Sequence, residues 1–188
     1  MVMKRISDVL LSLLLLCFLF IPMVLIALIV KLTSKGPALY WSDRVGINNT
    51  LFRMPKFRTM RTDTPAVATH LLHNPNSYVT PVGYYLRKFS LDEIPQLWSI
   101  FKGDMSFVGP RPALFNQDDL VELRTRKGVY TLVPGITGWA QINGRDDIPI
   151  PLKVEYDEYY LKNKSFFFDL KIILMTAIKV LKAEGVRH

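Results

Sequence analysis

The sequence has one cysteine, three histidines and no glycine-rich nucleotide-binding motif, and each scarcity excludes a class of protein. Cys17 has no partner for a disulfide, so neither a disulfide-stabilised fold nor a cysteine-based metal site is expected. His70 and His73 lie in a stretch rich in Thr, Pro and Asn, where solvated loop side chains are expected. The absence of both a P-loop and a GxGxxG pattern argues against an ordinary nucleotide-binding fold.

Charge is missing from Val9 to Val30, a run of 22 residues that contains one proline, Pro22. A helix needs roughly 20 apolar residues to cross a bilayer. The run is too long for the core of a secretory signal peptide, and no small-x-small cleavage site follows it. We therefore expect a membrane helix.

Both flanks of this run are basic, which leaves two topologies open. Lys4 and Arg5 precede it, and Lys31 and Lys35 follow it, whereas a crossing helix usually has its Lys and Arg excess on the cytoplasmic side. Equal flanks favour a segment that enters the membrane, bends and returns to the same face. Pro22 can produce the bend, because it lacks an amide donor and its ring clashes with the preceding helical turn. Proline is also tolerated in crossing helices, so charge alone does not choose between the two.

The rest of the chain, residues 36–188, is long enough for one domain with its own core. The net charge is +8, and Lys31 to Arg61 holds seven Lys or Arg against one acid, Asp43. Next to a membrane segment, such a patch suits anionic headgroups or substrate phosphates. Without a known nucleic-acid motif, nucleic acid is not an expected partner. The predicted domains are an anchor at 1–35 and a second unit at 36–188.

The predicted fold class is α+β and mainly helical. Two short β-prone runs separated by a Gly-Ile-Asn-Asn turn predict a small β-hairpin over residues 38–54. Helices are expected at 92–102, ended by Gly103, and at 118–126. Three segments rich in Pro, Gly, Thr or Asn are predicted to be loops or turns: 62–81, 109–112 and 134–138.

The C-terminal segment has apolar residues at helical spacing with lysines between them, which predicts an amphipathic helix. It runs over 170–181 and follows three consecutive phenylalanines, 166–168. One interpretation is a helix that closes the core. We favour the other, a helix in the membrane interface, because of the aromatic residues before it and the lysines on it.

The sequence around residue 92 has the strongest chemical pattern of the second unit. Ser90 and Glu93 have capping-box spacing, and Pro95 fits a first helical turn, so Asp92 and Glu93 should lie at a helix N-terminus. The helix dipole there favours ionised carboxylates and attracts phosphate oxygens. An ionised Asp can be a nucleophile, and an adjacent Glu can hold Mg²⁺. On this chemistry alone, simple helix capping is the more common role.

Cations elsewhere in the sequence provide groups for binding a diphosphate. Arg87 precedes the acid pair, Arg111 lies between two prolines, and Arg145 follows a turn glycine. Their planar guanidinium groups suit two-pronged phosphate binding, and Lys56 and Arg58 add positive charge. For each arginine the alternative is a surface salt bridge, and spacing alone does not show that these side chains converge.

These segments, in this order, resemble the monotopic phosphoglycosyl transferases, the bacterial sugar transferase family that acts on polyprenol phosphate. The resemblance covers essentially the whole chain. It rests on several long motifs: Lys56–Met60, Ser90–Leu97, Lys102–Pro112, Pro134–Gly138, Asn143–Arg145, Tyr156–Tyr160 and Asp169–Ile172.

The resemblance implies a membrane enzyme that begins glycan assembly on a lipid carrier. It would transfer a phosphosugar from a UDP-sugar to a polyprenol phosphate such as undecaprenyl phosphate, and release UMP. Asp92 would be the nucleophile that forms a covalent phosphosugar intermediate, with ping-pong kinetics, and Glu93 with Asp92 would bind Mg²⁺. The substrate-binding residues would be Arg87, Arg111, Arg145, Lys56 and Asp169.

The resemblance also implies a re-entrant anchor helix at the cytoplasmic face of the bacterial inner membrane. Family members typically carry Ser or Thr before the proline of the bend, whereas Ile21 precedes Pro22 here, so the bend would depend on Pro22 alone. The expected partners are a UDP-sugar, polyprenol phosphate and membrane lipid, with a second subunit as the alternative cover for exposed apolar surface.

Two other hypotheses fit the same residues. The first is a non-catalytic basic module that binds lipid or a partner, in which the acid pair is structural. The second is direct attack by polyprenol phosphate, with Asp92 as the base. No motif encodes the identity of the sugar.

Overall fold

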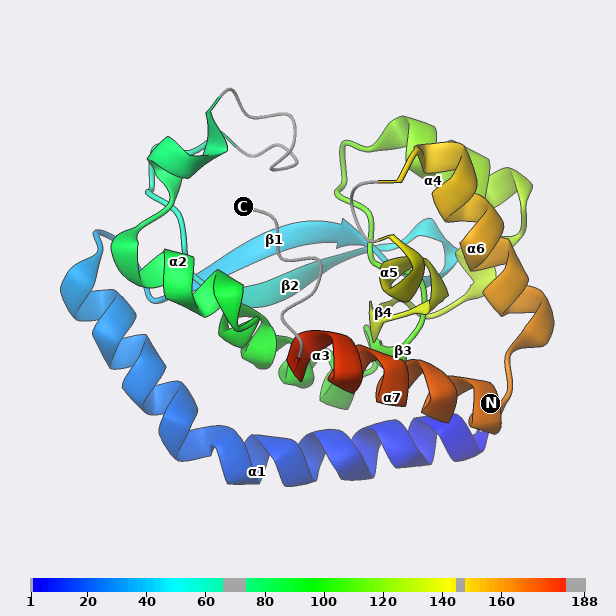
Figure 1. Cartoon of the computed structure of the whole chain (residues 1–188), viewed down its shortest axis with the longest axis horizontal. Coiled ribbons are helices and arrows are strands. Elements are labelled where there is room, and N and C mark those ends of the chain that lie inside the picture. The colour runs from blue at the N-terminus through cyan, green and yellow to red at the C-terminus, as the bar shows by residue number, and fades with distance from the viewer. Residues whose placement is uncertain (1, 66–73, 145–147, 182–188) are drawn as a thin grey trace.

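The computed structural model describes residues 2–65, 74–144 and 148–181. Helices dominate, and the strands form two small sheets (Figure 1). In chain order the elements are α1 Val2–Thr33, β1 Leu39–Val45, η1 Ile47–Asn49, β2 Leu51–Phe57, η3 Pro75–Tyr78, α2 Pro81–Lys88, η4 Leu91–Gln96, α3 Leu97–Lys102, β3 Ser106–Val108, α4 Asp118–Arg126, η5 Val129–Thr131, β4 Gly135–Thr137, α5 Trp139–Asn143, α6 Ile150–Asn163 and α7 Phe166–Leu181.

The apolar run lies within α1, a helix of 32 residues that contains Pro22. The helix bends along its length, and the rest of the chain lies on the inner side of the bend (Figure 1). Within α1 only Asp8, Ser12 and Val30 are buried. Among the described residues, it is the one helix long and apolar enough to cross a membrane. By length and composition, α1 could anchor the protein in a membrane.

The predicted β-hairpin is confirmed. Strands β1 and β2 pair antiparallel, from Leu39 opposite Phe57 to Val45 opposite Leu51, and the turn η1 joins them. Asn48 and Asn49 both have positive φ, 54° and 58°, a conformation that Asn tolerates better than most residues. The sequence signal of the turn was therefore sufficient to locate the hairpin.

A second, parallel pair of short strands was not predicted. Residues 134–138 were expected to be only a loop, but β4 within them pairs with β3, with Ser106 opposite Gly135 and Val108 opposite Thr137. Three residues are too few to produce a periodic pattern, and their partner lies far away in the sequence. A Cβ atom at Gly109 would collide with the carbonyl oxygen of Val133, so glycine permits this close approach. As a result, the turn at 109–112 lies against β4.

The helix predictions are right at 118–126 and need correction elsewhere. The expected helix at 92–102 is divided into the 3-10 helix η4 and the α-helix α3, which Gly103 ends with φ 105°. Pro95 within η4 lacks an N–H donor, which disfavours a continuous α-helical ladder there. The C-terminal helix begins earlier than expected, at Phe166. Helices α2, α5 and α6 were not predicted, and part of the predicted loop at 62–81 lies outside the described residues.

Helix α1 packs against the rest of the chain along one side. Leu15, Leu16 and Leu19 contact a cluster of buried residues from β2, α3 and the segment before β3. Further along, Val30 is buried in a cluster with Phe57 and Leu86. The other sides of α1 expose large apolar side chains, for example Phe18 at 77% and Ile21 at 70%. One long helix thus contributes both to the core and to an uncovered apolar surface.

The charged residues before the apolar run contact the rest of the protein. Lys4 Nζ donates to Asp169 Oδ2 at 2.6 Å, to the Tyr160 hydroxyl at 2.9 Å and to the Val108 carbonyl at 2.8 Å. Arg5 donates to two carbonyl oxygens near the end of α3, at 2.6 and 2.7 Å, where helical carbonyls lack partners within the helix. The N-terminal end of α1 is therefore attached to β3, α3, α6 and α7.

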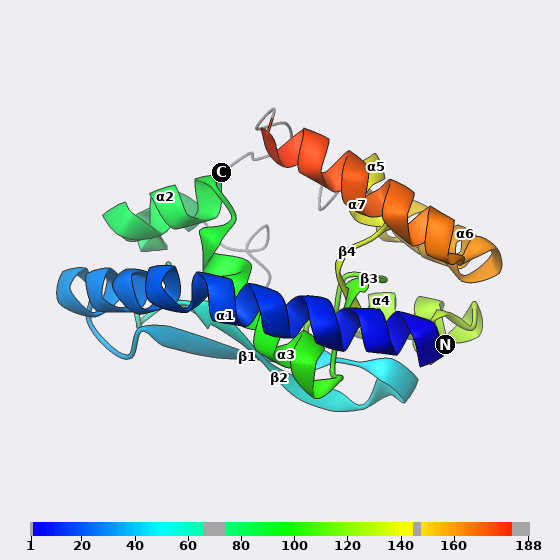
Figure 2. The same ribbon diagram turned by 90° about the horizontal axis from the view of Figure 1, so that it is seen from below.

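Helix α7 exposes a second set of apolar side chains. Seen from below, α1 crosses the molecule, and α7 and α2 lie to one side of it (Figure 2). The exposed apolar residues of α7 are Phe166, Phe167, Leu170, Ile173, Leu174, Ile178 and Val180. The amphipathic helix predicted at the C-terminus is confirmed as a helix with one uncovered apolar face.

Candidate active site

The acid pair lies in the first turn of η4, and the residue that precedes η4, Ser90, is strained. Ser90 has φ 55° and ψ 22°, a left-handed conformation that costs energy for any residue with a Cβ. The expected capping box is wrong: the Ser90 side chain makes no capping hydrogen bond within the described chain. The backbone carbonyl of Ser90 instead accepts a hydrogen bond from the amide of Glu93 at 3.3 Å. Backbone geometry thus sets the direction of Asp92 and Glu93.

Glu93 forms charged contacts with two cations from different parts of the sequence. Lys56 Nζ on β2 lies 2.7 Å from Glu93 Oε1, and Arg111 Nη2 lies 3.5 Å from the same oxygen. Burial opposes ionisation of Glu93, but the charges of Lys56 and Arg111 outweigh it and hold the pKa of this carboxyl well below its usual range. Glu93 is therefore ionised at neutral pH.

Asp92 has the opposite electrostatic environment, although it is the adjacent residue. Its side chain is buried, with 8% of the residue exposed. Burial raises the pKa of Asp92 and the charge of Glu93 adds to the increase, while Lys56 and Arg87 oppose it. The two shifts come from burial and neighbouring charges: Lys56 and Arg111 favour the ionised form of Glu93, whereas burial opposes ionisation of Asp92. Two neighbouring carboxyl groups with pKa values shifted in opposite directions are typical of active sites in which each carboxyl group has a different chemical role.

Arg87 completes the positive side of the site. It lies at the end of α2, and its Nε donates to the buried Thr59 hydroxyl at 3.0 Å. Burial lowers the pKa of Arg87, and the charges of Asp92 and Glu93 oppose that change. A guanidinium group starts from so high a pKa that it stays charged. Thr59, which orients Arg87, was not singled out from the sequence.

The structure brings together five of the predicted site residues from four separate segments. Asp169 is not part of this group. Asp169 pairs with Lys4 at 2.6 Å and accepts a hydrogen bond from Tyr160 at 2.6 Å, so a substrate role for it stays a prediction. Arg145 lies outside the described residues. The residues brought together are Lys56, Arg87, Asp92, Glu93 and Arg111.

A buried ion pair behind Arg111 was not anticipated from the sequence. Arg124 on α4 and Asp157 on α6 are 8% and 1% exposed, and Arg124 Nη2 lies 2.6 Å from Asp157 Oδ2. Leu120 and Arg124 are four residues apart, so they share the buried face of α4. The sequence signal that could have indicated this pair was the position of an arginine, Arg124, on the apolar face of an amphipathic helix.

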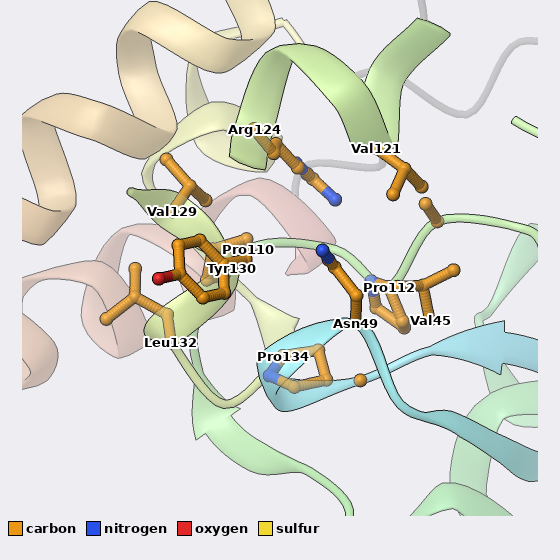
Figure 3. Close-up of a pocket in the computed structure, with 12 residues that line it drawn as sticks. Val45, Asn49, Pro110, Pro112, Val121, Arg124, Val129, Tyr130, Leu132 and Pro134 are labelled. Carbon is orange, nitrogen blue, oxygen red and sulfur yellow. The ribbon is translucent and has the colours of Figure 1, made fainter. Parts of the chain in front are cut away.

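Two hollows in the structure have the wrong size or chemistry for a sugar nucleotide. The first, beside Arg124, Pro110 and Pro112, has a volume of about 30 Å³, which is enough only for water (Figure 3). The second, of about 450 Å³, lies between α7 and the β3–β4 pair. Its lining is almost entirely apolar, with Phe107, Ile136 and Ile173 among its residues. The charged group around Glu93 is therefore the better candidate for binding phosphates.

Comparison with known proteins identifies the family of the chain. The sequence pattern of the bacterial sugar transferase family matches residues 1–183. The chain belongs to this family. It is thus an enzyme of the transferase class, and the hypothesis of a non-catalytic lipid-binding module is wrong.

Named relatives of this bacterial sugar transferase include an uncharacterized sugar transferase and enzymes of known activity. EpsL of Bacillus subtilis is 41% identical over 190 residues, which cover 100% of this chain and 92% of EpsL. The undecaprenyl-phosphate glucose phosphotransferase of Komagataeibacter xylinus is 38% identical over 94% of this chain and 35% of its own length. The UDP-glucose:undecaprenyl-phosphate glucose-1-phosphate transferase of Escherichia coli is 37% identical over 94% of this chain and 40% of its own length. The chain thus spans nearly all of EpsL but well under half of the other two proteins.

Proposed function

We propose that this sugar transferase moves a phosphosugar from a UDP-sugar to a polyprenol phosphate, releases UMP and so begins glycan assembly on a lipid carrier. The observation that carries the proposal is the position of Asp92 and Glu93 among Lys56, Arg87 and Arg111. Three cations around two carboxylates suit a diphosphate substrate. The names of the relatives from Komagataeibacter xylinus and Escherichia coli support the acceptor, and the second name supports the donor.

In the proposed mechanism Asp92 forms a covalent bond to the substrate. Its ionised carboxylate attacks the phosphorus that carries the sugar, and the bond from that phosphorus to the bridging oxygen of UMP breaks. UMP leaves with the electron pair of that bond. An oxygen of the polyprenol phosphate then attacks the aspartyl phosphosugar, forms the polyprenyl diphosphate sugar and restores the Asp92 carboxylate. Arg87, Arg111 and Lys56 hold phosphate oxygens during both steps, and Arg145 is a further proposed contact.

Mg²⁺ is the proposed cofactor, and Glu93 with Asp92 would hold it. The described part of the chain contains no cluster of three or more His, Cys, Asp or Glu residues that could hold a metal. Two carboxylates still fit Mg²⁺, which commonly binds one or two of them together with water and substrate phosphates. When bound, Mg²⁺ would offset the repulsion between the Asp92 carboxylate and the anionic diphosphate.

We propose that α1 enters the membrane and returns to the cytoplasmic face instead of crossing. Both ends of the helix contact the same folded body, through Lys4 and Arg5 at one end and Val30 at the other. A crossing helix would separate these ends by the roughly 30 Å hydrocarbon core, which would draw the body into lipid. The uncovered apolar face of α7 supports an interfacial position for that helix. Such anchoring would hold Asp92 near the headgroup level, where the acceptor phosphate lies.

Lipid is the proposed cover for these apolar surfaces, and a second subunit is the alternative. A homo-oligomer would cover part of α1 or α7 by contact between copies. Crosslinking in nanodiscs that hold one copy or two would separate these cases.

The proposed function is tested by UMP release from a panel of UDP-sugars, using purified enzyme in nanodiscs with Mg²⁺. Without polyprenol phosphate, the covalent mechanism predicts one UMP released per enzyme and a phosphosugar-labelled protein. Asp92→Asn should abolish both, because an amide is not a nucleophile for this step. Asp118→Asn, which changes an exposed acid at the start of α4, is the matched control and should behave like the wild type.

Each outcome of this experiment decides between mechanisms. Normal turnover with no labelled protein, together with no UMP release before the acceptor is added, would favour direct attack with Asp92 as a base. Full activity of Asp92→Asn would exclude both roles for this residue. Absence of UMP release from every UDP-sugar tested would overturn the proposed donor class.

A further inference from the structure

The segment Pro110–Arg111–Pro112 is held by its carbonyl oxygens from three sides. The Pro110 carbonyl accepts from the amide of Gly135 on β4 at 2.9 Å. The Arg111 carbonyl accepts from Arg124 Nη1 at 2.8 Å, and the Pro112 carbonyl accepts from Arg44 Nη1 at 3.2 Å. The two prolines have fixed φ angles and no N–H groups. Hydrogen bonds to the three carbonyls therefore determine how this segment lies.

Asp157 orients the Arg124 guanidinium group that contacts the segment Pro110–Arg111–Pro112. Its Nε and Nη2 donate to Asp157 Oδ2 at 3.0 and 2.6 Å. Because the guanidinium group is planar and rigid, these two bonds also fix the direction of Nη1, which donates to the Arg111 carbonyl. Figure 3 shows Arg124 extending from α4 toward the segment that carries Pro110 and Pro112. Asp157 on α6 and Arg124 on α4 thus together hold the backbone carbonyl of Arg111.

We propose that Arg124, oriented by Asp157, is a positioning residue for Arg111. By holding the Arg111 carbonyl, it sets the direction in which the Arg111 guanidinium faces Glu93 and, on the proposed function, the diphosphate of the donor. Arg124 does not contact the substrate in this proposal. The hollow beside it has a volume of only about 30 Å³, which leaves no room for one.

The chemistry of Arg124 explains why a simple replacement would not isolate this role. Burial raises the pKa of Asp157, and the charge of Arg124 opposes the increase. Arg124→Met would therefore leave a buried acid without its partner and destabilise the fold. Exchanging both residues for apolar ones of similar size is often neutral for stability. The pair Arg124→Met with Asp157→Leu removes the donor to Arg111 without leaving an unpaired charge.

The test is a double-mutant cycle between this pair and Arg111→Met. Thermal unfolding of the paired variant should stay within about 3 °C of the wild type, whereas kcat/KM for the UDP-sugar should fall roughly 10- to 100-fold, the size expected when a positioning contact is lost. In an Arg111→Met background the same pair should lower kcat/KM less than about threefold, because Arg111 is no longer present to be positioned. The control is Arg126→Met, which removes an exposed i,i+4 pair from the same helix and should leave kcat/KM unchanged.

The outcomes separate this inference from the proposed function. If the paired replacement lowers kcat/KM equally in the wild-type and the Arg111→Met background, the positioning role is overturned, even if the wild type releases UMP normally. If the wild type shows no transfer, the proposed function fails, and the same cycle is measured by calorimetric binding of UDP as a diphosphate probe. Coupling in UDP binding would then support the positioning role. If the paired replacement and Arg111→Met lower UDP affinity independently, or if the wild type does not bind UDP, the positioning role is overturned.

Discussion

Replacing Lys56 with methionine would remove the shorter of the two charged contacts to Glu93 and keep most of the length of the unbranched side chain. The pair lies 2.7 Å apart, and the two side chains are only 16% and 21% exposed. A hydrogen bond to a charged group contributes about 1.5–3 kcal/mol when its loss leaves the partner unsatisfied. Arg111, at 3.5 Å, only partly replaces it. For a chain of this size we expect the melting temperature to fall by about 3–12 °C at pH 7.

The matched control is Lys162→Met, because Lys162 forms an equally short pair in a more exposed place. Its ammonium lies 2.6 Å from Glu158, and the Lys162 side chain is 69% exposed. Glu158, like Glu93, has a second cationic partner, Lys127 at 3.1 Å. Exposed pairs of this kind contribute about 0–1 kcal/mol. Differential scanning fluorimetry in detergent would compare the two variants, and equal losses would refute the argument that burial gives the Lys56 pair its strength.

The pH dependence of the Lys56 effect follows from the lowered pKa of Glu93. Such a carboxyl stabilises the fold above its unfolded pKa of 4.5, and this stabilisation is lost as pH falls from there toward the lower folded value. Lys56→Met should bring the folded pKa closer to 4.5. The difference in melting temperature between the wild type and the variant should therefore narrow below about pH 4.5. A difference that stays constant down to pH 3 would contradict this reasoning.

Two further predictions concern the same turn. Because burial raises the pKa of Asp92 above 3.8 and only its ionised form attacks, kcat/KM should fall with decreasing pH at a higher pH than for an ordinary Asp; a rate that is flat down to pH 4 would contradict this. The effect of Asp92 on stability has the opposite pH dependence. Because the folded state keeps the Asp92 proton to a higher pH than the unfolded state, the contribution of Asp92 to the free energy of unfolding decreases as pH rises through its folded pKa. Ser90→Gly should raise the free energy of unfolding by about 0.5–1 kcal/mol, because glycine adopts φ 55° without steric cost. Thermal unfolding checks this change, with Ser90→Ala as the control that should give no increase.

Local sequence was sufficient to predict several parts of the fold. The Gly46–Asn49 turn located the hairpin, and the charged segment from Asp118 to Arg126 was predicted with the bounds of α4. The pairing of β3 with β4 could not be predicted in this way, because three-residue strands carry no period and their partners are distant in sequence. The end of the helix at Gly103 was right, but Pro95 divided that helix into two kinds of turn. Local rules therefore worked where short-range hydrogen bonds decide the conformation.

The sequence by itself determined an apolar helix of membrane length, a basic chain and an acid pair that matches a transferase motif. Only the tertiary structure decided which charges meet. Lys56 lies 37 residues before Glu93, and Arg111 follows it by 18, yet both contact one carboxylate oxygen. The fold also gave two adjacent acids opposite pKa shifts, and it placed Arg124 behind Arg111. The physical reason is that burial and charge proximity depend on how distant segments pack, and these two properties determine what a carboxylate or guanidinium can do.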